Sequence, residues 1–73
     1  MDFGGAIHTM IGGQKVRRSA WDGGISIHIQ KPDVHSKMTE PYFYRQQGEL
    51  DQGKTVPWIP SYEDMLADDW EYA

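Results

Sequence analysis

The chain has 73 residues and no cysteine, a combination that limits the ways in which it can be stable. A chain of this length buries only about 60% of the surface that its unfolded form exposes. Small proteins usually compensate for so thin a core with disulfides, a bound metal or self-association. The lack of cysteine excludes disulfides and thiolate metal sites. We therefore expect a single domain over residues 1–73 that is stabilised by association with further copies of itself.

Large aromatic side chains supply much of the material for packing. Three Trp, four Tyr and two Phe make 12% of the chain aromatic, while only 38% of the residues are hydrophobic. Such side chains dominate cores, interfaces and stacking sites. The composition favours a folded domain with an aromatic contact surface over a disordered chain.

The charge balance argues against a general nucleic-acid binder. Eleven acidic and seven basic residues give a formal net charge of −4, and affinity for DNA or RNA comes largely from clustered Lys and Arg. A few arginines that converge on one pocket would still bind a small anion. The first residues lack the basic stretch and apolar run of a signal peptide or membrane span, which predicts a cytoplasmic protein with no membrane partner.

Helical spacing marks the start of the chain and a segment near its end. Apolar residues at positions 3, 6, 7, 10 and 11 lie on one face of a predicted helix, with Asp2 as N-cap and Gly12-Gly13 at its end. Ser61, with an acid three residues later, forms a capping-box pattern that predicts a short second helix through Ala67.

Extended segments fill much of the chain between and after the helices. The clearest is 25–30, where isoleucine alternates with Ser26, His28 and Gln30, as in a half-buried strand. Shorter strands are predicted at 16–18, 41–46, 55–59 and 70–72, with a turn at 19–24, a surface loop at 31–39 and a polar connection at 46–54. The pattern predicts an α+β fold: an N-terminal helix packed on a small, mostly antiparallel sheet, with a short C-terminal helix.

Three blocks of sequence together resemble a known family. They are Phe3-Gly4 with Ala6, Lys15-Val16-Arg17-Arg18 before Trp21-Asp22-Gly23, and Val56-Pro57-Trp58-Ile59-Pro60-Ser61 before Leu66-Ala67-Asp68-Asp69-Trp70-Glu71. The ensemble is similar to the small phage and prophage family of the second type of Thoeris anti-defence protein. The likeness spans nearly the whole chain and is most specific in the C-terminal block, whereas 31–53 shows no pattern that can be placed on the family.

The resemblance implies a function as well as a fold. Members of this family are compact α+β subunits that assemble as homotetramers and enclose a cyclic ADP-ribose isomer, such as a glycocyclic form, without cleaving it. Bacterial TIR-domain proteins make that signal from NAD during infection, and the sponge keeps it from its effector. Some members also bind cyclic dinucleotides at a separate site. No cofactor, metal or catalytic residue is implied.

A sponge for this signal needs groups for an adenine ring, ribose hydroxyls and a pyrophosphate. Aromatic planes suit the first, carboxylates the second and arginines the third. With the resemblance, these needs point to Trp21 and Trp58 for stacking, Arg18 and Arg45 for the pyrophosphate, and Asp64 and secondarily Asp22 for the ribose.

Each of these residues also has a simpler interpretation. Trp21 suits a corner of the core, and Trp58 suits a core or subunit-interface anchor. Trp70 is expected to be a core residue. Asp22 and Asp64 each also have an adequate local explanation, as a turn residue and a helix-cap residue respectively.

The arginines have alternatives of the same kind. Arg17 and Arg18 are neighbours on a strand, so only one faces a given side; one is expected to reach a phosphate and the other to be solvated. Arg45 could instead form an exposed ion pair with Glu40 or Glu49.

Two rival functions stay open on the sequence. The first is hydrolysis of the same signal with Asp64 or His28 as general base, although no nucleophile motif is present and the spacing of His8, His28 and His35 is not that of a metal site. The second is a protein-interaction module that blocks a host protein through its aromatic surface.

Overall fold

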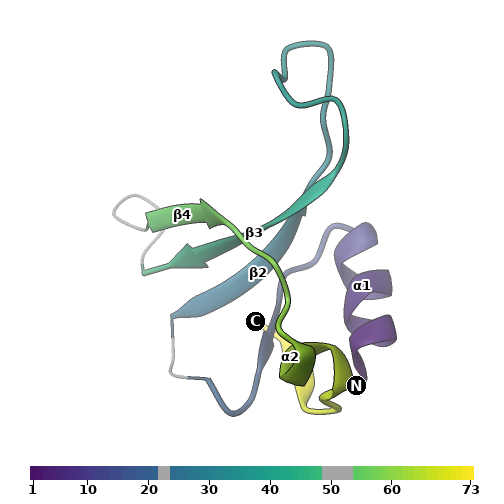
Figure 1. Ribbon diagram of the computed structural model, residues 1–73, viewed down its shortest axis with the longest axis vertical. Coiled ribbons are helices and arrows are strands. Elements are labelled where there is room, and N and C mark those ends of the chain that lie inside the picture. The colour runs from purple at the N-terminus through teal and green to yellow at the C-terminus, as the bar shows by residue number, and fades with distance from the viewer. Residues whose placement is uncertain (22–23, 49–53) are drawn as a thin grey trace.

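The computed structural model describes residues 1–21, 24–48 and 54–73, and in these ranges it contains one sheet and two helices. The elements are α1 (Phe3–Ile11), β1 (Val16–Arg18), β2 (Ile25–Gln30), β3 (Tyr42–Gln47), β4 (Lys54–Pro57), α2 (Tyr62–Leu66) and β5 (Trp70–Tyr72). The strands pair antiparallel in the order β4-β3-β2-β1-β5, and Figure 1 shows β4, β3 and β2 side by side. The predicted α+β fold is confirmed.

Helix α1 begins and ends as its sequence predicts. The Asp2 carboxylate accepts a hydrogen bond from the Gly5 amide at 2.8 Å and so satisfies a free donor of the first turn. Gly12 caps the other end, and Gly13 has a φ of 97°, a conformation that glycine adopts without a steric penalty. These two ends fix the length of the helix and the face that it turns to the sheet.

The core lies between α1 and strands β1, β2 and β5. Its buried side chains are Ala6 and Met10 from α1, Val16 from β1, Ile27 from β2 and Trp70 from β5. Trp70 is 2% exposed, which confirms its predicted place in the core. Because β5 pairs with β1, the edge strand β5 contributes the largest side chain of this core.

The register of the sheet decides which polar residues share the face of the core. Val16 lies opposite Ile27, Ile27 opposite Arg45, and Arg45 opposite Val56. Directly opposed residues point to the same side of a sheet, so Arg45 lies in one row with buried apolar residues. Arg18 lies opposite Trp70 on this same face.

The opposite face of the sheet carries the alternate residues of each strand. The predicted alternation in β2 is confirmed, since Ile27 is buried and Ser26, His28 and Gln30 lie on the other side. These polar residues are half-buried rather than exposed. One reason is that the His28 ring stacks on the Tyr44 ring at a centroid distance of 4.8 Å.

Helix α2 is shorter than its pattern predicts. The capping box is present, with Ser61 as N-cap and Asp64 at the third helical position. The helix ends at Leu66, whereas the sequence predicted that it would include Ala67. The ψ of Ala67 is 150°, an extended conformation that directs the chain toward β5.

The two helices lie close together on one face of the sheet. In Figure 1, α1 and α2 lie beside each other near the N-terminus, and the connection between β2 and β3 projects away from them. No helix in the described ranges is long and apolar enough to cross a membrane.

Candidate ligand-binding site

A pocket of about 440 Å³ opens beside the aromatic end of the core. Among the described residues, its lining consists of Ala20, Trp21, Ile25, Arg45, Trp58 and Asp64. The volume falls in the range of about 300–1,000 Å³ that is typical of small-molecule sites. Four of the six residues predicted for the site, Trp21, Arg45, Trp58 and Asp64, are thus brought together from a turn, a strand, an extended segment and a helix.

The aromatic wall of the pocket is continuous with the core. The rings of Trp21 and Trp58 meet edge to face at a centroid distance of 6.2 Å, and Trp21 meets Trp70 in the same way at 5.3 Å. Both pocket tryptophans are half-buried. Trp21 therefore packs on the core, as its simpler interpretation holds, and also lines the pocket. The edge-to-face contacts hold both rings in defined orientations before any ligand arrives.

Arg45 supplies positive charge to the pocket. Its side chain extends from β3 on the core face, and its Nε atom is buried without a hydrogen-bond partner among the described residues. No ion pair joins Arg45 to Glu40, and Glu49 lies outside the described residues. A buried guanidinium nitrogen without a partner raises the free energy of the protein, so a ligand atom that accepts its hydrogen bond is bound more tightly.

Asp64 supplies a carboxylate that is held firmly in place. The residue is 8% exposed; its Oδ1 accepts a hydrogen bond from Arg18 Nη1 at 3.1 Å, and its Oδ2 accepts one from the Ser61 amide at 3.0 Å. Burial raises the pKa of this carboxyl, but the hydrogen bonds from Ser61 and Arg18 together bring the pKa below its usual value. Asp64 is therefore an anion at neutral pH.

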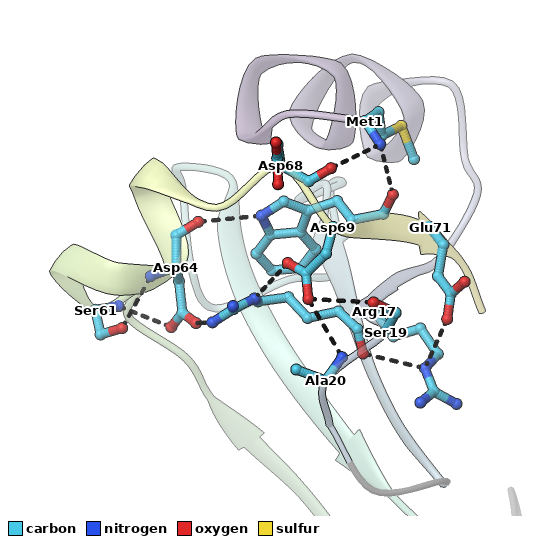
Figure 2. A network of polar contacts seen from close by, with 11 residues as sticks. Met1, Arg17, Ser19, Ala20, Ser61, Asp64, Asp68, Asp69 and Glu71 are labelled. Atoms are coloured by element: carbon cyan, nitrogen blue, oxygen red, sulfur yellow. Dashed lines mark hydrogen bonds and ion pairs between the residues drawn. The ribbon is translucent and has the colours of Figure 1, made fainter.

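Arg18 is not among the described residues that line the pocket, but it contacts the lining residue Asp64. Its Nε donates to Asp69 Oδ1 at 2.8 Å and its Nη1 to Asp64 (Figure 2). Asp69, followed by Asp64, raises the pKa of the Arg18 guanidinium. The expected direct contact of Arg18 with a pyrophosphate is not what this geometry favours, because two carboxylates already engage the guanidinium.

Arg17 lies on the opposite side of the sheet from Arg18, as strand alternation predicts, but it is not simply solvated. Its Nε lies 3.5 Å from a carboxylate oxygen of Glu71, and its Nη2 donates to the Trp21 carbonyl at 2.8 Å. The Trp21 amide in turn donates to the Arg18 carbonyl at 3.1 Å. The two arginines thus hold the backbone of the residue that lines the pocket.

Sequence reasoning missed Ala20 and Ile25 as lining residues and Asp69 as the partner of Arg18. Ile25 belonged to an alternating pattern that indicated only core packing, and Ala20 carries no chemical signal. Asp69 lies 51 positions from Arg18, and a pairing at that distance leaves no trace in the spacing. The predicted secondary residue Asp22 lies outside the described residues.

A second, smaller pocket lies on the other side of β2. Its volume is about 260 Å³, and its lining includes Lys15, Arg17, Ser26 and Gln46. It therefore presents two basic side chains together with hydrogen-bonding groups.

A comparison with models of protein families identifies the family of this chain. The model of the Tad2-like family, described as a Thoeris anti-defense 2-like domain, matches residues 1–73. The chain belongs to the Tad2-like family. A comparison with curated proteins gave no match. The resemblance read from the three sequence blocks is confirmed, and membership of the Tad2-like family gives the chain an anti-defence role against Thoeris.

Proposed function

We propose that the chain blocks Thoeris immunity by binding a TIR-produced cyclic ADP-ribose signal tightly and without cleaving it, in the cytoplasm of the bacterial host. The observation that carries this proposal is the pocket itself. It places around one space two tryptophans, an ionised aspartate and an arginine whose buried Nε has no hydrogen-bond partner among the described residues. These groups match the base, the pyrophosphate and the ribose of such a ligand.

The free hydrogen-bonding capacity of the pocket suits that assignment. An ionised carboxylate has about four acceptor positions, and within the described part of the chain Asp64 uses two of them, for Arg18 and the Ser61 amide. The others are available to ribose hydroxyls. Arg45 takes the pyrophosphate, Trp21 and Trp58 contact the base, and Arg18 contributes by holding Asp64.

The environments of Asp64 and His28, the two candidate general bases, favour sequestration of the signal over its hydrolysis. A general base works best with a pKa near the working pH, whereas the Asp64 carboxyl has a lowered pKa and is engaged by Arg18. His28 lies on the sheet face away from the core, and burial followed by the charge of Lys15 lowers its pKa. Neither residue is arranged to activate a water molecule in the pocket.

We also propose that the working form is a homotetramer whose subunits close over the pockets. Ile59, Tyr62 and Leu66 are 87%, 75% and 70% exposed and flank the pocket residues Trp58 and Asp64 in sequence. Apolar groups exposed side by side mark interaction surfaces. A second copy seated there would cover both this surface and the open side of the pocket.

The same exposed residues are the observation that favours the rival function. A host protein could dock on Ile59, Tyr62 and Leu66, and the chain would then act as a protein-interaction inhibitor. The two functions differ in what the purified protein captures: a nucleotide for the sponge, a host protein for the inhibitor.

A cyclic dinucleotide is the second ligand that the family resemblance suggests. Its candidate place is the smaller pocket, where Lys15 and Arg17 would face its phosphates. It would bind there without displacing the cyclic ADP-ribose, because the two pockets share only Ile25 among their described lining residues.

The deciding experiment is a capture and release assay. The purified protein is incubated with TIR-generated cyclic ADP-ribose, freed of small molecules and heat-denatured, and the released material is analysed by mass spectrometry. Recovery of the unchanged signal in stoichiometric amount supports the sponge. A degraded signal points to the hydrolase, and an unbound signal points to another ligand or to a protein partner. Light scattering in the same buffer tests the tetramer against the monomer mass of 8.4 kDa.

A further inference from the structure

Asp69 collects hydrogen bonds from three consecutive residues at the end of β1. Its carboxylate accepts from Arg18 Nε at 2.8 Å, Ser19 Oγ at 3.2 Å and the Ala20 amide at 3.2 Å (Figure 2). Its backbone carbonyl accepts from the Ser19 amide at 3.0 Å. Arg18 lowers the pKa of this carboxyl, with a further contribution from Ala20, so these donors meet a charged acceptor.

These bonds reach two separate walls of the pocket. Through Ala20, which lines the pocket, Asp69 holds the segment that leads directly into Trp21. Through Arg18 it reaches Asp64, because the same guanidinium that binds Asp69 donates to Asp64 Oδ1 at 3.1 Å. Asp69 itself is not among the described lining residues of the pocket.

Asp64 is fixed from a third direction. The Trp70 indole donates to the Asp64 carbonyl at 3.0 Å, and the Ser61 amide holds one carboxylate oxygen. The other carboxylate oxygen depends on Arg18, and the direction in which Arg18 points depends on Asp69. The orientation of the Asp64 carboxylate is therefore set in part by a residue five positions away that does not touch it.

We propose that Asp69 is a positioning residue for the pocket: by holding Arg18 and the Ala20 amide it fixes the Asp64 carboxylate and the Trp21 ring relative to each other, and so sets the affinity for the ligand. This inference rests on the function proposed for the pocket. A ligand that meets both walls at once gains affinity when those walls are already in place, since no ordering remains to be done upon binding.

The exposure of the Asp69 side chain distinguishes a positioning role from a general contribution to the stability of the fold. The Asp69 side chain is 26% exposed, and Ser19 and Ala20 are exposed. Water can therefore replace the lost bonds when the carboxylate is removed, and an ion pair in such a position contributes little to folding. Removing the carboxylate is expected to loosen the two walls while the core stays intact.

The test compares Asp69→Asn with Asp68→Asn. Asp68 is the adjacent acid, is exposed, and makes no side-chain hydrogen bond among the described residues, so it controls for the loss of one negative charge. An asparagine at position 69 can still accept from Arg18, but its amide group cannot replace the oxygen that faces Ala20. We expect Asp69→Asn to weaken binding of TIR-generated cyclic ADP-ribose by about 10-fold to 100-fold, the range seen when residues that orient metal ligands are removed. Asp68→Asn should bind like the wild type.

A second readout follows the pocket wall without any ligand. The indole N–H signal of Trp21 in NMR spectra of the free protein should shift in Asp69→Asn and stay in place in Asp68→Asn, with similar melting temperatures for both. If Asp69→Asn does not fold, Arg18→Lys replaces it, because a lysine keeps the charge but cannot hold both carboxylates in a fixed geometry.

The outcomes separate this inference from the proposed function. A wild-type protein that does not bind the nucleotide overturns the function of the pocket. A wild-type protein that binds it, together with an Asp69→Asn variant of equal affinity and an unmoved Trp21 signal, overturns the positioning role alone.

Discussion

Replacing Trp70 with phenylalanine removes the indole N–H while keeping an aromatic ring in the core. That N–H donates to the Asp64 carbonyl at 3.0 Å, and the bond is buried. A buried acceptor that loses its partner costs about 1–3 kcal/mol, and the smaller ring adds roughly 1 kcal/mol of lost packing. We expect Trp70→Phe to lose about 2–4 kcal/mol of the free energy of unfolding. For a chain of this size the total is only about 4–11 kcal/mol.

The assay is thermal unfolding at a fixed protein concentration, since the proposed self-association would make the melting temperature depend on concentration. In a domain of 60–100 residues, 1 kcal/mol corresponds to about 4–8 °C, so Trp70→Phe should melt roughly 10–30 °C lower. Trp58→Phe is the matched control: Trp58 is half-buried, and its indole makes no hydrogen bond among the described residues. Equal losses in the two variants would refute the role given to the indole bond.

Three further results are expected. Trp21→Ala should lose ligand binding in isothermal titration while light scattering shows the same mass as for the wild type; an unfolded variant, or one of lower mass, would show instead that the packing of Trp21 on the core is its main role. Ser61→Ala should lower the free energy of unfolding in urea by about 1 kcal/mol, because it removes the capping hydroxyl of α2, whereas Ser36→Ala in the projecting loop should change it far less. The stability that Asp64 contributes is fully present above its unfolded pKa of about 3.9 and is lost as the pH falls through its lowered folded pKa. The melting temperature should therefore decrease as the pH is lowered below about 4, and this decrease should be smaller in Asp64→Asn. An equal dependence of the melting temperature on pH in the two proteins would contradict the charge assigned to Asp64.

Local signals made much of the fold predictable. The Asp2 and Ser61 caps, the Gly12-Gly13 end of the first helix and the alternation of 25–30 are each determined by near neighbours in sequence, and the structure confirms them. The end of α2 differs from the prediction because alanine favours helix on its own, whereas Ala67 is extended in the structure, at the start of the short segment that leads to β5.

The site was predictable in its residue types but not in its connections. Aromatic rings, an arginine and an aspartate could be chosen for their chemistry, and Trp21, Arg45, Trp58 and Asp64 do meet in one pocket. Whether an arginine faces a ligand or an acid depends on strand register. Arg18 lies opposite Trp70 and within reach of Asp69, and this pairing of the first strand with the last is a property of the whole fold.

The position of β5 also bears on how the protein is made. Synthesis runs from the amino end, so Trp70 is the last core residue to leave the ribosome, after Ala6, Met10, Val16 and Ile27. Until it emerges, the nascent chain has an incomplete core and β1 lacks one of its two partners. Contacts between such distant parts of a chain form late, and the unfinished apolar surface invites aggregation. We therefore expect folding in a single late step, and chains interrupted before residue 70 should be substrates for chaperones and proteases.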